Sequence, residues 1–316
     1  MQRKVIQIAN STYLVSLPKA WMEKHGIHKG DSLEIRDEKN SLNIYPVTHK
    51  HKETKTTLDI SELDRSSILH SIRALYRKGF DEVILNFSKQ SVPHFRVSAQ
   101  VNIINVIHEE VNRLIGYEIV RQTPESCEIK DLSASSIKEF DVVLRRIMLL
   151  IKDITSDLLK GVLTHERMLL ESIDQKHNTI TKFISYCLRL LNKYGYIDAH
   201  KTTILYHIIA SLDKVVDIIK YVARDCLVSK KELSKTTKAL FERTHINCIL
   251  VYIDLFYSFN QKNIIKFMRN RDVVTKVISA NIGKMPCNDV AILTKYMQSL
   301  EILLDLIEAR LALEHV

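Results

Sequence analysis

Two pairs of acidic residues stand at the same spacing in two similar stretches of the sequence. The stretch SLDKVVDII contains Asp213 and Asp217. The stretch SLEILLDLI contains Glu301 and Asp305 in the same frame. Both lie inside long helical patterns, where residues four apart share one face and two like charges cost about 0.2–0.5 kcal/mol. A pair that recurs in this way indicates a cation that offsets the repulsion.

Carboxylates gathered on a helix face are ligands for divalent or ferric metal ions, with water completing the coordination shell. The alternative is a solvated face on which Lys214 and Lys220 screen Asp213 and Asp217. An acid and a histidine also stand three apart at residues 174–177. Di-iron proteins of the ferritin type need such a pair twice, so this single pair does not predict one. No set of catalytic residues can be named from spacing, and we expect a protein that is not an enzyme.

The bulk composition favours a helical cytoplasmic protein. The 316 residues include only 7 Gly and 5 Pro, and the net charge of +9 suits contact with nucleic acid or another anionic surface. The five cysteines form no C-x-x-C pair, which is typical of reduced thiols in the cytosol. No run of about 18 apolar residues and no apolar leader occur, so we expect a cytoplasmic protein without membrane insertion.

The first fifty residues predict a small β unit. Two short strands near residues 5–8 and 13–17 precede Pro18, which starts a short helix that ends at Gly26. Two alternating segments, 32–36 and 41–46, then form a hairpin. A unit of this size buries too little apolar surface to be stable alone. We therefore expect it to pair with a second copy, which gives a homodimer.

This unit resembles the SpoVT-AbrB swapped-hairpin family, whose intertwined dimers bind DNA. The resemblance covers residues 1–48 and rests on Arg3-Lys4-Val5, Ser11, Val15-Ser16-Leu17-Pro18-Lys19, Gly26-Ile27 and Gly30-Asp31. It implies that basic side chains contact DNA phosphates. The candidates are Arg3, Lys4, Lys19 and Lys24. The alternative is a module that only dimerises, since the unit has just two arginines.

Residues 55–130 predict a small α/β domain. The pattern reads strand, helix, strand, helix, strand, strand, with the second helix over Phe95–Ile115, and suggests a two-layer sandwich. No phosphate-binding glycine loop occurs, and no chemistry is visible in this segment.

Residues 135–316 predict six helices in two matching halves, 135–228 and 230–316. The apolar spacing places the helices at about 137–161, 166–194, 199–227, 230–259, 262–282 and 288 to the end. The two acidic stretches are 88 residues apart, and each lies on the third helix of its half. The halves therefore indicate a duplicated three-helix unit.

This region resembles the PhoU family, whose members have two three-helix bundles with an acid-x-x-x-Asp motif in each. The resemblance implies metal binding by both acidic pairs. It also places Glu171 and Asp174 opposite the first pair, and Glu308 after the second. Residues 261–263, opposite the second pair in this reading, carry no acid, so that site is expected to be weaker.

The three parts together resemble an archaeal PhoU-type regulator with an N-terminal AbrB-like domain. The expected fold class is multidomain α+β: a swapped-hairpin β-barrel half, a small α/β domain, and an all-α pair of three-helix bundles. The expected function is regulation of phosphate uptake or phosphate-responsive transcription, through DNA binding and the sensing of metal or a partner. One alternative is an interaction module that binds a phosphate-transporter ATPase or a sensor kinase. Another is an enzyme that uses a carboxylate-bound metal.

Overall fold

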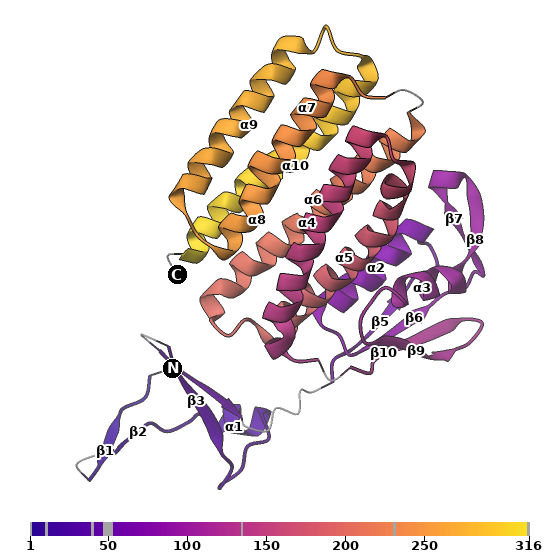
Figure 1. Ribbon diagram of the computed structural model, residues 1–316. Coiled ribbons are helices and arrows are strands. Elements are labelled where there is room, and N and C mark those ends of the chain that lie inside the picture. Colours follow the sequence, from indigo (N-terminus) through magenta and orange to yellow (C-terminus); the bar gives the residue numbers. More distant parts are fainter. Residues whose placement is uncertain are drawn as a thin grey trace. The chain divides into compact units, whose positions relative to one another are not determined.

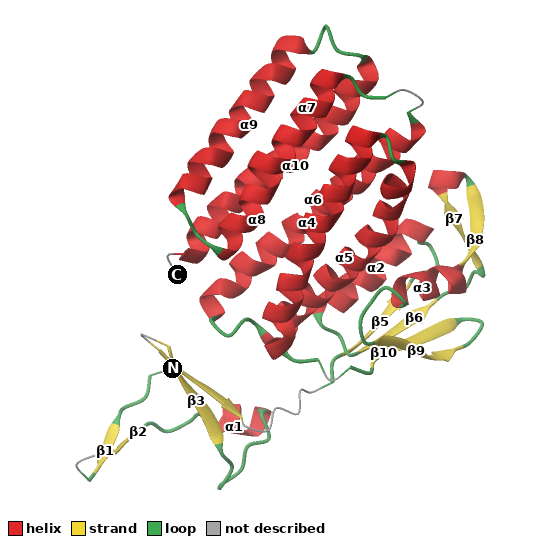
Figure 2. Ribbon diagram, in the orientation of Figure 1, coloured by secondary structure: helices red, strands yellow, loops and turns green. Residues whose placement is uncertain are grey.

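The chain divides into two compact units, Met1–Glu53 and Thr54–Val316. The computed structural model describes residues 2–9, 12–38, 41–46, 53–133, 135–229 and 232–314. Figure 1 follows the chain by colour, and Figure 2 separates its helices from its strands. The first unit is mainly strand, and the second combines an α/β part with a large helical part, so the coarse multidomain α+β prediction is confirmed.

The N-terminal unit has the predicted order of strand, strand, helix, strand, strand. Pro18 precedes the helix, and Gly26 adopts a φ of +62° just after it, a left-handed conformation that favours glycine. Each pair of strands is an antiparallel two-stranded sheet. The elements are β1 (Ile6–Ile8), β2 (Thr12–Leu14), α1 (Lys19–Lys24), β3 (Leu33–Glu38) and β4 (Ser41–Pro46).

The N-terminal unit buries very little of its apolar surface. Among the apolar residues described in it, Ile27 alone is buried, whereas side chains on and beside its strands are exposed. The exposed ones are Val5, Ile6, Ile8, Tyr13, Leu14, Val15, Ile35 and Leu42. As it stands, the unit has strands but almost no core.

The α/β part of the second unit is built on a four-stranded sheet. The strand order is β5-β6-β10-β9, with β5 parallel to β6 and the other pairs antiparallel. The side chain of Asp64 caps helix α2, and Gly79 ends it at a φ of +104°. The elements are β5 (Lys55–Asp59), α2 (Arg65–Lys78), β6 (Glu82–Asn86), β7 (Ser91–His94), β8 (Ala99–Asn102), α3 (Ile103–Val111), β9 (Tyr117–Gln122) and β10 (Ser126–Asp131).

The predicted helix over Phe95–Ile115 is wrong in its first half. Residues 91–102 form a hairpin of β7 and β8 around a short 3-10 turn, in which Ser98 has a left-handed φ of +51°. Helix α3 begins only after Asn102, whose side chain accepts a hydrogen bond from the Asn105 backbone N–H. This cap fixes the true start of the helix, which apolar spacing alone does not reveal.

Seven α-helices in the described part of residues 135–314 follow the predicted positions closely. They are α4 (Phe140–Thr164), α5 (Arg167–Tyr194), α6 (Thr202–Val228), α7 (Lys235–Thr244), α8 (Leu250–Tyr257), α9 (Gln261–Asn281) and α10 (Cys287–Glu314). The predicted fourth helix, 230–259, starts outside the described residues and is divided into α7 and α8 by a π-helical turn over His245–Ile249. None of the described helices is long and apolar enough to cross a membrane.

The helices lie side by side, with the α/β part at one edge and α9 at the other (Figure 1). Helix α5 packs against α4, α6 and also α2, while α6 packs against α10. The third helices of the two halves, α6 and α10, therefore meet in the middle. Among the described helices, α2 packs mainly against α5 of the first half, and this asymmetry decides the surroundings of the two acidic motifs.

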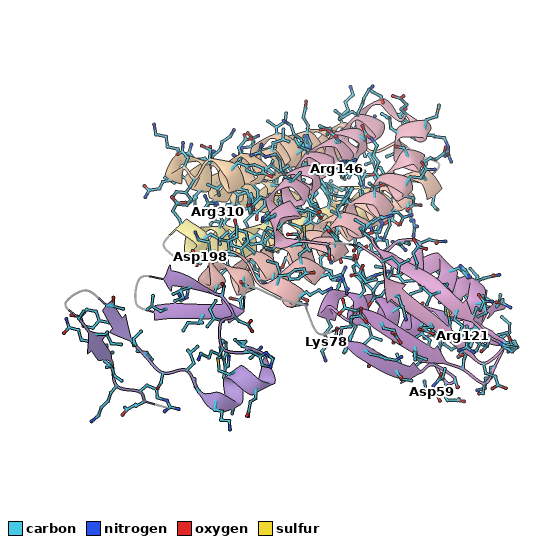
Figure 3. The ribbon with its side chains drawn as sticks, turned by 90° about the horizontal axis from the view of Figure 1, so that it is seen from below. Asp59, Lys78, Arg121, Arg146, Asp198 and Arg310 are labelled. Carbon is cyan, nitrogen blue, oxygen red and sulfur yellow. The ribbon has the colours of Figure 1, made fainter. Side chains whose placement is uncertain are left out.

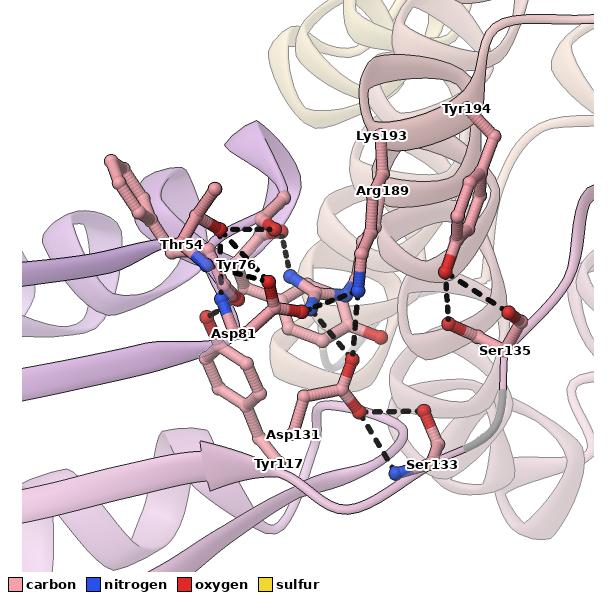
Figure 4. Close-up of polar contacts among 12 residues, drawn as sticks. Thr54, Tyr76, Asp81, Tyr117, Asp131, Ser133, Ser135, Arg189, Lys193 and Tyr194 are labelled. Carbon is pink, nitrogen blue, oxygen red and sulfur yellow. Dashed lines mark hydrogen bonds and ion pairs between the residues drawn. The ribbon is translucent and has the colours of Figure 1, made fainter. Parts of the chain in front are cut away.

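A buried arginine joins the α/β part to the helices. Arg189 of α5 is fully buried and donates to the Asp131 carboxylate at 2.6 Å and to the Tyr76 carbonyl oxygen at 2.9 Å (Figure 4). Its guanidinium also lies 4.8 Å and 5.1 Å from the ring centres of Tyr76 and Tyr117. Removing one partner of such a buried pair costs about 3–5 kcal/mol. This contact is one of several that tie the α/β part to the helices within residues 54–316.

Candidate functional site

The first acidic motif holds side chains from other helices. Asp213 is buried on α6 and accepts a hydrogen bond of 2.9 Å from Arg77 of α2. Arg77 also donates to the Ser185 hydroxyl of α5, at 3.0 Å and 3.2 Å. The Asp213 carboxylate is thus the anchor that fixes the end of α2 against α5 and α6.

Asp217, one turn further along α6, lies between a histidine and a lysine. Its Oδ1 is 2.9 Å from His177 Nε2 and 2.7 Å from Lys220 Nζ. Partial burial alone would raise the pKa of Asp217, but the hydrogen bonds from His177 and Lys220 outweigh it and hold the pKa well below its usual range. Asp217 is therefore ionised and already neutralised by protein groups.

The acids predicted to face this pair do not join it. Asp174 forms an ion pair with Arg224 at 2.8 Å, and Glu171 is exposed and lies 3.7 Å from Arg167 on its own helix. Asp174 does line the same cavity as Asp213 and Asp217, but its carboxylate is bound by a guanidinium.

The second motif lies on the surface. Glu301 of α10 accepts hydrogen bonds from Arg271 of α9 at 2.6–3.0 Å, and Asp305 and Glu308 are exposed. The prediction that this motif faces residues 261–263 is wrong, because its partner on α9 lies about two to three turns further along the helix.

The predicted metal site does not fit this arrangement. Within the described part of the chain, no group of three or more His, Cys, Asp or Glu side chains is placed to hold a metal ion. The reason is physical: most of the predicted ligands already carry a basic partner, and a second cation would be repelled. Metal binding by the residues named for it stays a prediction that this arrangement of the described side chains does not favour: Asp213, Asp217, Glu171, Asp174, Glu301, Asp305 and Glu308.

A large polar cleft, which sequence reasoning missed, surrounds the first motif instead. Its volume is about 870 Å³, and its walls come from α2, the end of α3, α5 and α6. Arg65, Arg73 and Arg77 contribute from one face of α2, where their spacing of eight and four residues is helical. That spacing is visible in the sequence, but it becomes informative only once α2 is known to face the helices.

The four basic residues predicted to contact DNA are all exposed. Arg3 and Lys4 precede β1, and Lys19 and Lys24 lie on α1. Lys19 makes an exposed contact of 3.6 Å with Glu23, a pair that contributes at most about 1 kcal/mol. Their charges are therefore accessible to an anionic partner.

The N-terminal unit matches a known protein family. A family model described as antidote-toxin recognition MazE, bacterial antitoxin, matches residues 6–50. This match supports the predicted swapped-hairpin domain, and it spans much less than half of the chain. Searches of curated proteins and of solved structures found no match. The resemblance of residues 135–316 to PhoU proteins stays a prediction.

Proposed function

We propose that the protein is a homodimeric DNA-binding regulator in which residues 54–316 control the activity of the N-terminal unit. The observation that carries the proposal is the set of exposed apolar side chains in a unit that matches a MazE-type domain. Such side chains require cover, because burial of apolar surface contributes about 25 cal/mol per Å². A second copy of the same hairpins supplies that cover.

The basic residues supply the DNA contact. Pairing two copies brings together two sets of Arg3, Lys4, Lys19 and Lys24, all of which are exposed. Lys and Arg side chains that neutralise phosphates release counterions, so the affinity falls steeply with salt. We also propose that the signal sensed by the protein is phosphate status, as in PhoU-type regulators. The support for this signal is the resemblance of the two matching helical halves to that family.

A second candidate is a protein-binding module in which the N-terminal unit only dimerises. The scarcity of arginine in residues 1–48 favours it, since arginine is the usual reader of guanine edges. Its partner would be a toxin, as the description of the MazE family indicates, or a transporter ATPase or sensor kinase, as the PhoU resemblance implies. Recovery of such a partner together with an absence of DNA binding would support this candidate.

The test combines solution mass with DNA binding. We expect the full chain to sediment as a dimer, and Tyr13→Asp to make it a monomer, because a charge on the apolar surface opposes pairing. We expect genomic DNA fragments to bind at moderate salt, and Lys4→Glu with Lys19→Glu to weaken binding at least tenfold while the dimer persists. A monomeric wild-type chain, or a dimer that binds no fragment, would overturn the proposal.

A further inference from the structure

The cleft around the first acidic motif carries an excess of positive charge. Of the described side chains that line it, nine are Lys or Arg and four are Asp or Glu. One further carboxylate, that of Glu110, lies behind the wall and is buried. Counted over Lys, Arg, Asp and Glu alone, the excess is about four positive charges.

Three of the arginines are held in fixed positions. Glu109 accepts from Arg65 at 2.6 Å, and Glu110 accepts from Arg73 at 2.7 Å and 2.9 Å. Asp213 holds Arg77 from the opposite wall. A guanidinium has five N–H donors, so each of these groups keeps donors for a ligand. The carboxylates orient the arginines, which lowers the entropy cost of binding an anion.

Other basic side chains in the cleft lack a carboxylate partner. Arg113 donates to the Thr181 hydroxyl at 3.3 Å. Lys78, at the end of α2 where the α/β part meets the helices, lies 5.3 Å from the Phe80 ring centre (Figure 3). Within the described residues, neither Arg113 nor Lys78 nor Arg96 forms an ion pair with a carboxylate. A ligand with several negative charges would satisfy them.

We propose that this cleft binds a small ligand that carries more than one phosphate group. Guanidinium groups match the geometry of phosphate oxygens in paired hydrogen bonds. The volume of about 870 Å³ lies within the range of small-molecule sites and exceeds what one phosphate needs. Basic groups come from α2 and, on the opposite wall, from Lys214, Lys220 and Arg224 of α6, so the ligand bridges α2 to α6.

The arginines are recessed in the cleft, which favours a small ligand over a nucleic acid backbone. The side chains of Arg65, Arg73 and Arg77 are only 21%, 22% and 20% exposed. A DNA duplex is a broad convex surface and cannot reach groups recessed to this degree. The inference does not depend on DNA contact by the N-terminal unit, and the two can fail separately.

Calorimetric titration of the full chain tests the proposal. The probes are pyrophosphate, ATP, inorganic phosphate and sulfate, each at equal ionic strength. We expect pyrophosphate or ATP to bind at one site per chain and at least tenfold more tightly than inorganic phosphate. Equal binding of pyrophosphate and ATP identifies the phosphate chain as the recognised group, whereas tighter binding of ATP adds recognition of the nucleoside.

Two arginine variants serve as test and matched control. Arg113→Gln removes a charge from the cleft, and Arg121→Gln removes one from exposed strand β9, away from the cleft. We expect the first to weaken pyrophosphate or ATP binding at least tenfold and the second to leave it unchanged, with both variants retaining the wild-type circular dichroism spectrum. Equal loss in both, no binding of either probe, or equally tight inorganic phosphate would overturn the proposal. Displacement of the bound probe by a DNA duplex in wild type and Lys4→Glu alike would also overturn it.

Discussion

The two acidic motifs have nearly the same sequence but different roles. Asp213 in the first motif has a side chain that is 11% exposed and holds Arg77 of α2. Glu301 at the equivalent position of the second has a side chain that is 51% exposed and pairs with Arg271 of α9 at the surface. The difference arises outside the motif, because α2 packs against the first half through α5 and places Arg77 beside Asp213.

This contrast shows that a repeated acidic pair does not by itself specify a ligand. Asp213 and Glu301 are each paired with an arginine from a neighbouring helix, and the two halves of the helical part have different neighbours. In the first half these groups also line a cleft, whereas in the second Arg271 pairs with the exposed Glu301 at the surface. The first motif therefore holds arginine and lysine side chains in place at the cleft, whereas the second forms an ion pair at the protein surface.

The largest expected effect separates the two motifs by stability. Asp213→Ala leaves the Arg77 guanidinium without its carboxylate in a half-buried position, so we expect the free energy of unfolding to fall by about 3 kcal/mol. Glu301→Ala is the matched control and should cost less than about 1 kcal/mol, because exposed ion pairs contribute little. Urea unfolding followed by circular dichroism measures both. Equal losses would show that the two motifs are equivalent after all.

The second prediction compares the buried histidines of the two halves. His177 in the first half is paired with Asp217, whereas His245 in the second half is buried at the π-helical turn and its Nδ1 lacks a hydrogen-bond partner in the described structure. Burial lowers the pKa of His245 from 6.5 to about 4. Because the unfolded chain takes up the proton first, the stability that this residue contributes is complete above pH 6.5 and is lost as the pH falls toward 4.

The size of this effect follows from linkage. Between pH 7.5 and pH 5, His245 should lower the free energy of unfolding by about 2 kcal/mol. Urea unfolding at several pH values measures the slope, and His245→Leu should flatten it in this window. His177→Leu is the comparison in the first half and should leave the His245 contribution to the slope in place. An unchanged slope in His245→Leu would show that this histidine is not the acid-sensitive group.

The sequence predicts the elements of this protein far better than their contacts. Apolar spacing placed the long helices within a few residues, and Gly26 and Gly79 marked the ends of two others. The hairpin at 91–102 was not predicted, because the spacing of its apolar residues is also compatible with a helix. The pairing of Arg77 with Asp213 joins residues 136 positions apart, and no local period encodes which distant charge a carboxylate meets. The sequence therefore identifies the acidic residues of the two motifs. It predicts metal ions as their partners, whereas the structure places arginine and lysine side chains beside most of them.

The smallest expected effect concerns metal itself, and it tests whether both motifs are satisfied by protein cations. A metal ion whose free concentration is one hundred times its Kd would raise the free energy of unfolding by about 2.7 kcal/mol. Removal of that metal would lower Tm by several degrees. Since Asp217 is paired with Lys220 and hydrogen-bonded to His177, and Glu301 is paired with Arg271, we expect a chelator to change Tm of the full chain by less than about 1 °C. Elemental analysis of the purified protein is the independent measurement. Stoichiometric metal that is lost in Asp217→Asn would restore the first motif as a metal site, and loss in Asp305→Asn would do so for the second.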